Sequence, residues 1–146
     1  MNFNNFTIKS QEAIQKAVEI TRAAGTQAIE PVCLLKGVMD EGETVVNFIF
    51  QKIGANASAV QRQVEAEISA LPKVSGQEPY LSRSSNDVLQ KALDTAKKMG
   101  DEYVTLEALL LAIFEVSSPA ATILKDAGLG RKELEAAIEE LRKGKK

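Results

Sequence analysis

Histidine is absent from this chain of 146 residues, and cysteine occurs once, at Cys33. Without histidine the chain cannot build a Ser–His or Cys–His nucleophile, and it lacks the commonest general base. Zinc sites are usually built from several cysteine or histidine ligands, so a zinc site is not expected either. A single cysteine cannot form a disulfide within the chain, and the apolar run around Cys33 predicts a buried core residue. These absences exclude the commonest enzyme classes, and we expect a binding protein with no resident metal.

An excess of one charge and a long apolar run are also missing. The 18 basic and 20 acidic residues are mixed along the chain, for a net charge of −2, whereas a nucleic-acid binder usually carries a basic excess. No apolar run approaches the roughly 20 residues that cross a membrane. Residues 1–6 lack the pattern of a signal peptide, and no phosphate-binding Gly-Lys-Ser/Thr loop occurs. We therefore expect a cytoplasmic protein that binds neither nucleic acid nor membrane, and no ATP through such a loop.

The strongest positive feature of the sequence is an internal repeat. When the sequence is compared with itself, paired segments align over most of both halves, with one deletion. A helical unit that is used twice generally buries the apolar face of each copy against the other. The paired positions are 15–18 with 90–93, Gly25 with Gly100, Ile29 with Val104, Leu34 with Leu109, Gly54 with Gly128, and Val60 with Leu134.

Each copy is predicted to contain four helices. Apolar residues recur at helical spacing from Ile8 onward, Thr7 stands at the N-cap position, and Gly25 stands where a left-handed cap ends a helix. The two prolines and the glycine of residues 72–81 predict an extended connector. Because alternating β-branched residues are absent, we expect no substantial sheet. The predicted helices are 8–24, 31–39, 44–53 and 57–71 in the first copy, and 84–99, 106–115, 119–127 and 131–142 in the second.

The predicted fold is therefore a single all-α domain over residues 1–146. It is a pseudo-twofold tandem repeat of a four-helix unit, with the first copy at about 7–71, the connector at 72–81 and the second copy at about 82–142. The junction between the two copies is the natural place for a binding groove.

Two acidic segments and four aromatic residues are candidates for function. Residues 40–43 hold three carboxylates at a helix end and predict a surface turn, with weak cation binding as the alternative. Asp101 and Glu102 predict surface charge, with an acid–base pair as the alternative. The aromatic residues either seal the seam between the copies or offer anchors to a partner: Phe3, Phe6, Tyr80 and Tyr103.

Several segments resemble the N-terminal domains of the Clp chaperones. They are Phe6-Thr7 with the helix that follows at 11–17, and the doubled pattern of residues 25–35 and 100–110. The resemblance covers essentially the whole chain. Within the family, residues 71–76 are most similar to the ClpB-type disaggregases.

The resemblance implies a substrate-binding N-terminal domain of an ATP-dependent disaggregase, which engages unfolded or aggregated polypeptides. ATP and Mg²⁺ would then belong to the ATPase modules of a homohexameric parent, and this domain would hold no cofactor and be a monomer in isolation. ClpC-type and ClpA-type relatives use the same domain to dock adaptor or other co-chaperone proteins and to feed a protease, which is the alternative function. A third alternative, a helical enzyme, would rest on Asp101 and Glu107 as acid and base.

The resemblance also implies site residues. Thr7, Asp101 and Glu107 match positions implicated in substrate handling, and Leu89 and Ala108 match the apolar groove. Ala108 is smaller than the leucine expected there, which implies a groove of different depth. ClpC-like domains read phosphorylated arginine through two glutamates, and this chain keeps only Glu107. The resemblance therefore argues against phospho-arginine recognition.

Overall fold

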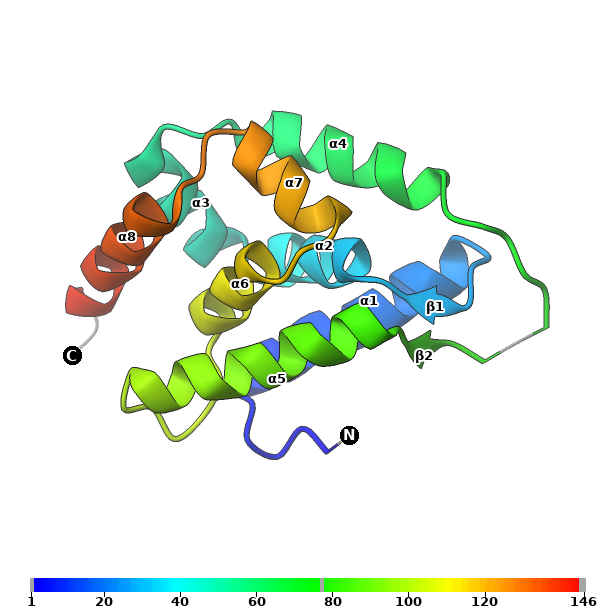
Figure 1. Cartoon of the computed structure of the whole chain (residues 1–146), viewed down its shortest axis with the longest axis horizontal. Coiled ribbons are helices and arrows are strands. Elements are labelled where there is room, and N and C mark those ends of the chain that lie inside the picture. Colours follow the sequence, from blue (N-terminus) through cyan, green and yellow to red (C-terminus); the bar gives the residue numbers. More distant parts are fainter. Residues whose placement is uncertain (1, 77, 145–146) are drawn as a thin grey trace.

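The computed structural model describes residues 2–76 and 78–144, and that part of the chain contains eight helices and two very short strands (Figure 1). Gln77 of the connector, Met1, Lys145 and Lys146 lie outside the described residues. The all-α prediction is confirmed, and every helix ends within two residues of its predicted bound. The helices are α1 (Ile8–Ala23), α2 (Pro31–Glu41), α3 (Glu43–Ile53), α4 (Ala57–Ser69), α5 (Arg83–Lys98), α6 (Leu106–Glu115), α7 (Pro119–Asp126) and α8 (Arg131–Lys143).

Local signals in the sequence explain these helix ends. The Thr7 side chain accepts a hydrogen bond from the backbone N–H of Ser10 and so caps α1. Gly25 and Gly100 follow the ends of α1 and α5 with φ of +72° and +76°, a conformation that costs other residues more. Pro31 and Pro119 occupy the first turns of α2 and α7, where no intrahelical N–H bond is lost.

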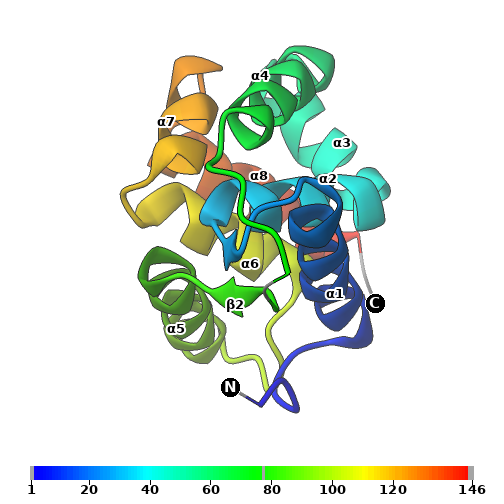
Figure 2. The same cartoon turned by 90° about the vertical axis from the view of Figure 1, so that its right-hand side faces the viewer.

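The helices form three layers. The middle layer is α2 with α6, α1 and α5 cover it on one side, and α3, α4, α7 and α8 cover it on the other (Figures 1 and 2). A helix that is apolar on all faces must be enclosed by its neighbours. In agreement, every residue of α6 from Leu106 to Phe114 is buried.

The two copies of the repeat are interlocked rather than side by side. The backbone of Phe6, before α1, pairs with Val104, before α6. The equivalent contact in the other direction joins β1 (Ala28–Ile29), before α2, to β2 (Tyr80–Leu81), before α5, with Ile29 opposite Leu81. The expectation of no substantial sheet is confirmed, since each of these strands has two residues. Two-residue strands are too short to show the alternating pattern by which strands are recognised in a sequence.

The outer layer also crosses between the copies. Helix α3 of the first copy packs on α8 of the second, and α4 of the first packs on α7 of the second. Each copy thus supplies part of the other's core, as the repeat predicts. Cys33 lies in this core with no exposed surface, as expected.

Among the described residues, no single helix is long and apolar enough to cross a membrane. Helices α6 and α7 together have the length and apolar composition of a membrane span, but they are bent by 98° to each other.

Candidate functional site

The four aromatic candidates divide into two pairs. Phe6 is buried, and Phe3 packs edge-on against it, with ring centroids 5.5 Å apart and an interplanar angle of 82°. Tyr80 and Tyr103 are instead 54% and 47% exposed. The phenylalanines therefore seal the seam between the copies, and the tyrosines are available for contact with a partner.

Ile8 differs from its predicted place. The apolar spacing assigns it to the buried face of α1, but it is 75% exposed. It is the first residue of α1, and the buried face of this helix begins at Ser10. The backbone N–H of Thr7 donates to the carbonyl oxygen of Val104 at 3.0 Å, so Ile8 and Tyr103 each lie one residue from this bond. An exposed aliphatic side chain and an exposed aromatic one therefore lie in the same region of the surface.

A hollow of about 390 Å³ lies between the N-terminal segment, α5 and the turn from α5 to α6, and Val104, the residue after Tyr103, is part of its lining. Its apolar lining comes from Leu93, Ala96 and Val104, and Asp101 is one of its polar lining residues. The hollow therefore combines apolar side chains with a carboxylate. The complete lining is Asn5, Gln90, Leu93, Asp94, Ala96, Lys97, Asp101, Glu102 and Val104.

Leu89 and Ala108, expected in an apolar groove, are both fully buried and do not line this hollow. Leu89 lies on the core side of α5, and Ala108 lies in the enclosed helix α6. On α5 it is Leu93, one helical turn after Leu89, that lines the hollow. The structure thus brings Thr7 and Asp101 to one end of the molecule and keeps Leu89 and Ala108 in its interior.

The two carboxylates expected in the site are held by a cation that the sequence did not reveal. Arg142, in the last turn of α8, donates from Nη2 to Asp101 Oδ1 at 2.5 Å and from Nη1 to Asp101 Oδ2 at 2.8 Å. The same Nη1 donates to Glu107 Oε2 at 3.4 Å. The side chain of Glu107 is 3% exposed, that of Asp101 18% and that of Arg142 32%. We call Asp101, Glu107 and Arg142 the ion triad.

Bonding within the ion triad also changes the acidity of its cation. The hydrogen bonds that Arg142 donates to Asp101, together with the nearby negative charges, raise the pKa of Arg142 above its ordinary value, against an opposing effect of burial. Arg142 therefore stays charged, and the triad has a net charge of −1 when both carboxylates are ionised.

The first copy of the repeat has no charges at the equivalent positions. Thr26 corresponds to Asp101 and Val32 to Glu107, and Ile68 of α4 corresponds to Arg142 of α8. All three are buried. At these three equivalent positions, the first copy therefore has apolar and hydroxyl side chains, and the second copy has the ion triad. The sequence signal that identifies Arg142 is a difference between the copies, since a charged residue stands where the first copy has Ile68.

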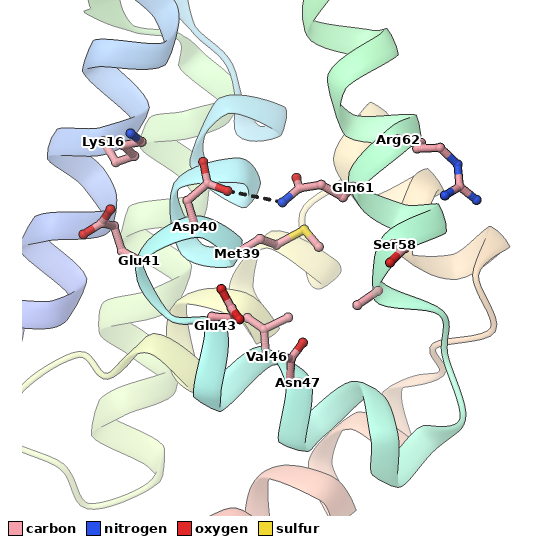
Figure 3. A pocket seen from close by; sticks show the side chains of 11 residues that line it. Lys16, Met39, Asp40, Glu41, Glu43, Val46, Asn47, Ser58, Gln61 and Arg62 are labelled. Carbon is pink, nitrogen blue, oxygen red and sulfur yellow. Dashed lines mark hydrogen bonds between the residues drawn. The ribbon is translucent and has the colours of Figure 1, made fainter.

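The acidic segment of residues 40–43 borders a second hollow, of about 700 Å³, between α1, α2, α3 and α4 (Figure 3). Asp40 is bonded to Lys36 at 3.3 Å and accepts from Gln61 Nε2 at 3.2 Å. Asp40 is thus a partly buried member of a small polar network. Within the described residues, no group of acidic, cysteine or histidine side chains has the arrangement to hold a metal ion.

The structure therefore defines a two-fold repeat of helices with exposed apolar side chains and carboxylates at one end. The model of the Clp repeat (R) N-terminal domain matches residues 5–127, and the chain belongs to this family.

Relatives of known name support the same family. The chain is 62% identical over 146 residues to the chaperone protein ClpB of Bacteroides thetaiotaomicron, covering 100% of the chain and 17% of that protein. It is 55% identical over 145 residues to ClpB of Porphyromonas gingivalis, covering 99% of the chain and again 17% of the relative. The chain thus spans about a sixth of the length of these relatives.

Solved structures share the fold at lower identity. The N-terminal domain of Hsp104 from Candida albicans matches with a TM-score of 0.80 at 22% identity, over 95% of this chain and 92% of that one. The N-terminal domain of ClpD, a caseinolytic protease associated chaperone from Arabidopsis thaliana, matches with a TM-score of 0.73 at 22% identity, over 97% of each chain.

Proposed function

We propose that this chain is the polypeptide-binding N-terminal domain of a ClpB-type disaggregase, and that it engages unfolded or aggregated polypeptide. The observation that carries the proposal is the exposure of Ile8 and Tyr103 beside the hollow that contains Leu93 and Asp101. The high identity to two ClpB chaperones supports the choice of parent. In such a parent, ATP and Mg²⁺ belong to the hexameric motor, and this domain supplies binding alone.

The chemistry of the surface suits an unfolded chain. Unfolded polypeptide exposes apolar side chains that are buried in the native state, and covering apolar surface yields about 25 cal/mol per Å². Ile8 and Tyr103 present such surface without any change of fold. The nearby carboxylates add charge selection, which favours segments that carry basic residues. Binding of this kind is weak and tolerant of sequence, as a domain that receives many substrates requires.

The test compares the variants Ile8→Ser and Tyr103→Ser, singly and together, with Tyr80→Ser. Tyr80 is a matched control because it is exposed to a similar extent but lies on β2, away from the hollow. The titrant is fluorescein-labelled, reduced and carboxymethylated α-lactalbumin, followed by anisotropy. We expect the double variant to bind about tenfold more weakly, because two apolar anchors are lost. Equal weakening by Tyr80→Ser, or no effect of the double variant, would contradict the proposed surface.

Adaptor docking is the second candidate function. Its support is the shared fold with ClpD, a caseinolytic protease associated chaperone. If the wild-type domain shows no affinity for the labelled polypeptide but binds one folded partner, adaptor docking replaces polypeptide capture as the function.

A further inference from the structure

The ion triad adjoins the proposed binding surface through Asp101, which lines the hollow and is at the same time bonded to Arg142 of the same chain. Arg142 holds both oxygens of Asp101 and reaches Glu107 with the same guanidinium. A polypeptide that uses these carboxylates therefore meets a surface whose charges are already satisfied. The inference below rests on the proposed function and concerns how that surface is opened.

Packing alone does not require the ion triad. The first copy closes the equivalent place with Thr26, Val32 and Ile68, all buried. Replacing a buried ion pair by well-packed apolar residues is often neutral or stabilising. The same fold is thus packed with apolar side chains in the first copy and with an ion triad in the second. This difference indicates that the ion triad has a function other than stabilising the fold.

The contact is built so that it can open. Arg142 is one residue from the end of α8, and its side chain is 32% exposed. Helix ends fray at low cost, and a partly solvated ion pair is worth little after solvent screening. Glu107, by contrast, lies in the first turn of the enclosed helix α6 and is 3% exposed, so it stays in place when Arg142 leaves.

We propose that Arg142 is an autoinhibitory latch, an internal ligand that keeps Asp101 and Glu107 closed to polypeptide until a basic side chain of the incoming segment displaces it. A guanidinium or ammonium group from the polypeptide takes over the bonds to the two carboxylates. The exchange costs little because Glu107 is never left buried without a cation, which is the expensive state. Segments that combine a basic residue with apolar neighbours open the latch, and purely apolar segments bind beside it on Ile8 and Tyr103.

The latch is tested with Arg142→Gln, which removes the internal cation, and Arg142→Lys, which keeps the charge and loses the paired N–H donors. Arg131→Gln is the control, because Arg131 also lies on α8 and pairs with Glu115 and Glu135, at the other end of the helix. The probes are two fluorescein-labelled apolar peptides that differ only in one central residue, arginine or glutamine. Circular dichroism establishes that each variant is folded.

We expect Arg142→Gln to bind the arginine peptide about three- to tenfold more tightly than wild type does. Arg142→Lys gives an intermediate gain and decides the question if Arg142→Gln does not fold. The glutamine peptide and the Arg131→Gln control show no change. If wild type binds and Arg142→Gln binds equally or more weakly, the latch is overturned and the proposed function stands. If no form of the domain binds either peptide, both proposals are overturned.

Discussion

Ser10 and Ser85 make the same hydrogen bond, one from each copy of the repeat. The hydroxyl of Ser10 in α1 donates to the carbonyl oxygen of Val104 at 2.8 Å, and that of Ser85 in α5 donates to the carbonyl oxygen of Ile29 at 2.6 Å. Both serines are fully buried, and each bond crosses from one copy of the repeat to the other. The pseudo-twofold relation of the sequence is thus present in the hydrogen bonds that join the copies.

Ser10→Ala and Ser85→Ala are expected to destabilise the domain by similar amounts. Each leaves a buried carbonyl oxygen with one bond fewer, at a cost of about 1–3 kcal/mol. Urea unfolding followed by circular dichroism measures the free energy of unfolding. Ser58→Ala is the control, because Ser58 is exposed on α4 and should change stability by less than about 0.5 kcal/mol. A loss at only one of the two buried serines would contradict their equivalence.

Gly37→Ala is expected to be strongly destabilising, because the backbone of α1 lies directly against α2 at this residue. A Cβ atom at Gly37 would overlap the carbonyl oxygen of Ala13, which is backbone and cannot rotate away. Overpacking of this kind costs about 1–3 kcal/mol or more. Thermal and urea unfolding measure the loss. In the matched control Gly144→Ala, the new Cβ atom meets only the Leu141 carbonyl oxygen at 3.6 Å, so little change is expected.

Exchanging the ion triad for its counterparts from the first copy should separate stability from binding. In the variant Asp101→Thr, Glu107→Val, Arg142→Ile, no buried charge remains, so the free energy of unfolding should stay within about 1 kcal/mol of wild type. Arg142→Ile alone should cost more, because Glu107 is then buried without a cation. Urea unfolding compares the two variants.

The same triple variant should lose its preference for the arginine peptide over the glutamine peptide, since both carboxylates are gone. Anisotropy titration with the two peptides measures this preference. A triple variant that is less stable than Arg142→Ile alone would show that the ionic end is required for packing, against the comparison with the first copy.

Cys33 is expected to resist thiol reagents in the folded protein. It is fully buried, and burial raises the pKa of its thiol above the ordinary value, so less thiolate is present at a given pH. At pH 8 the native domain should react with a disulfide reagent such as DTNB only at the rate of unfolding, whereas the urea-unfolded chain should react at once with one equivalent. Rapid reaction without denaturant would mean that the core around Cys33 opens readily.

Because the folded pKa of Cys33 is raised, the same group also affects stability at alkaline pH. Its contribution is fully present below the unfolded pKa of the thiol and is lost as pH rises through the folded pKa. The loss of stability on going to alkaline pH should therefore be smaller in Cys33→Ala, whose equivalent in the second copy is already Ala108.

All eight helices could be predicted, because the signals for their ends are local. Thr7 and Thr105 cap helices through side chains that bond to the backbone three residues later, and Pro31 and Gly25 act within a single turn. Ile8 was assigned to the wrong face, because periodicity identifies a stripe but not the residue at which the stripe leaves the core. The pairing of Ile29 with Leu81 was missed, because a two-residue strand leaves no pattern.

The sequence alone also could not predict which candidate site residues are exposed. Leu89 and Leu93 lie one turn apart on α5, and both suit an apolar face, yet the first is buried and the second lines the hollow. Which of them meets solvent depends on where α6 packs. The site role of Leu89, Ala108, Thr7, Asp101 and Glu107 remains a prediction, and the triple variant above tests it for Asp101 and Glu107.

The residues alone thus establish a doubled helical unit without histidine, since both helical periodicity and the chemistry of side chains are properties of short segments. The ion triad, by contrast, could be identified only from the tertiary structure. Arg142 is 41 positions from Asp101 and 35 from Glu107, and nothing in a helix of mixed charge says which distant carboxylate its arginine will meet. The packing of α8 against the middle layer determines the partners of Arg142. Burial of the apolar face of α8 holds the last turn of this helix beside the two carboxylates.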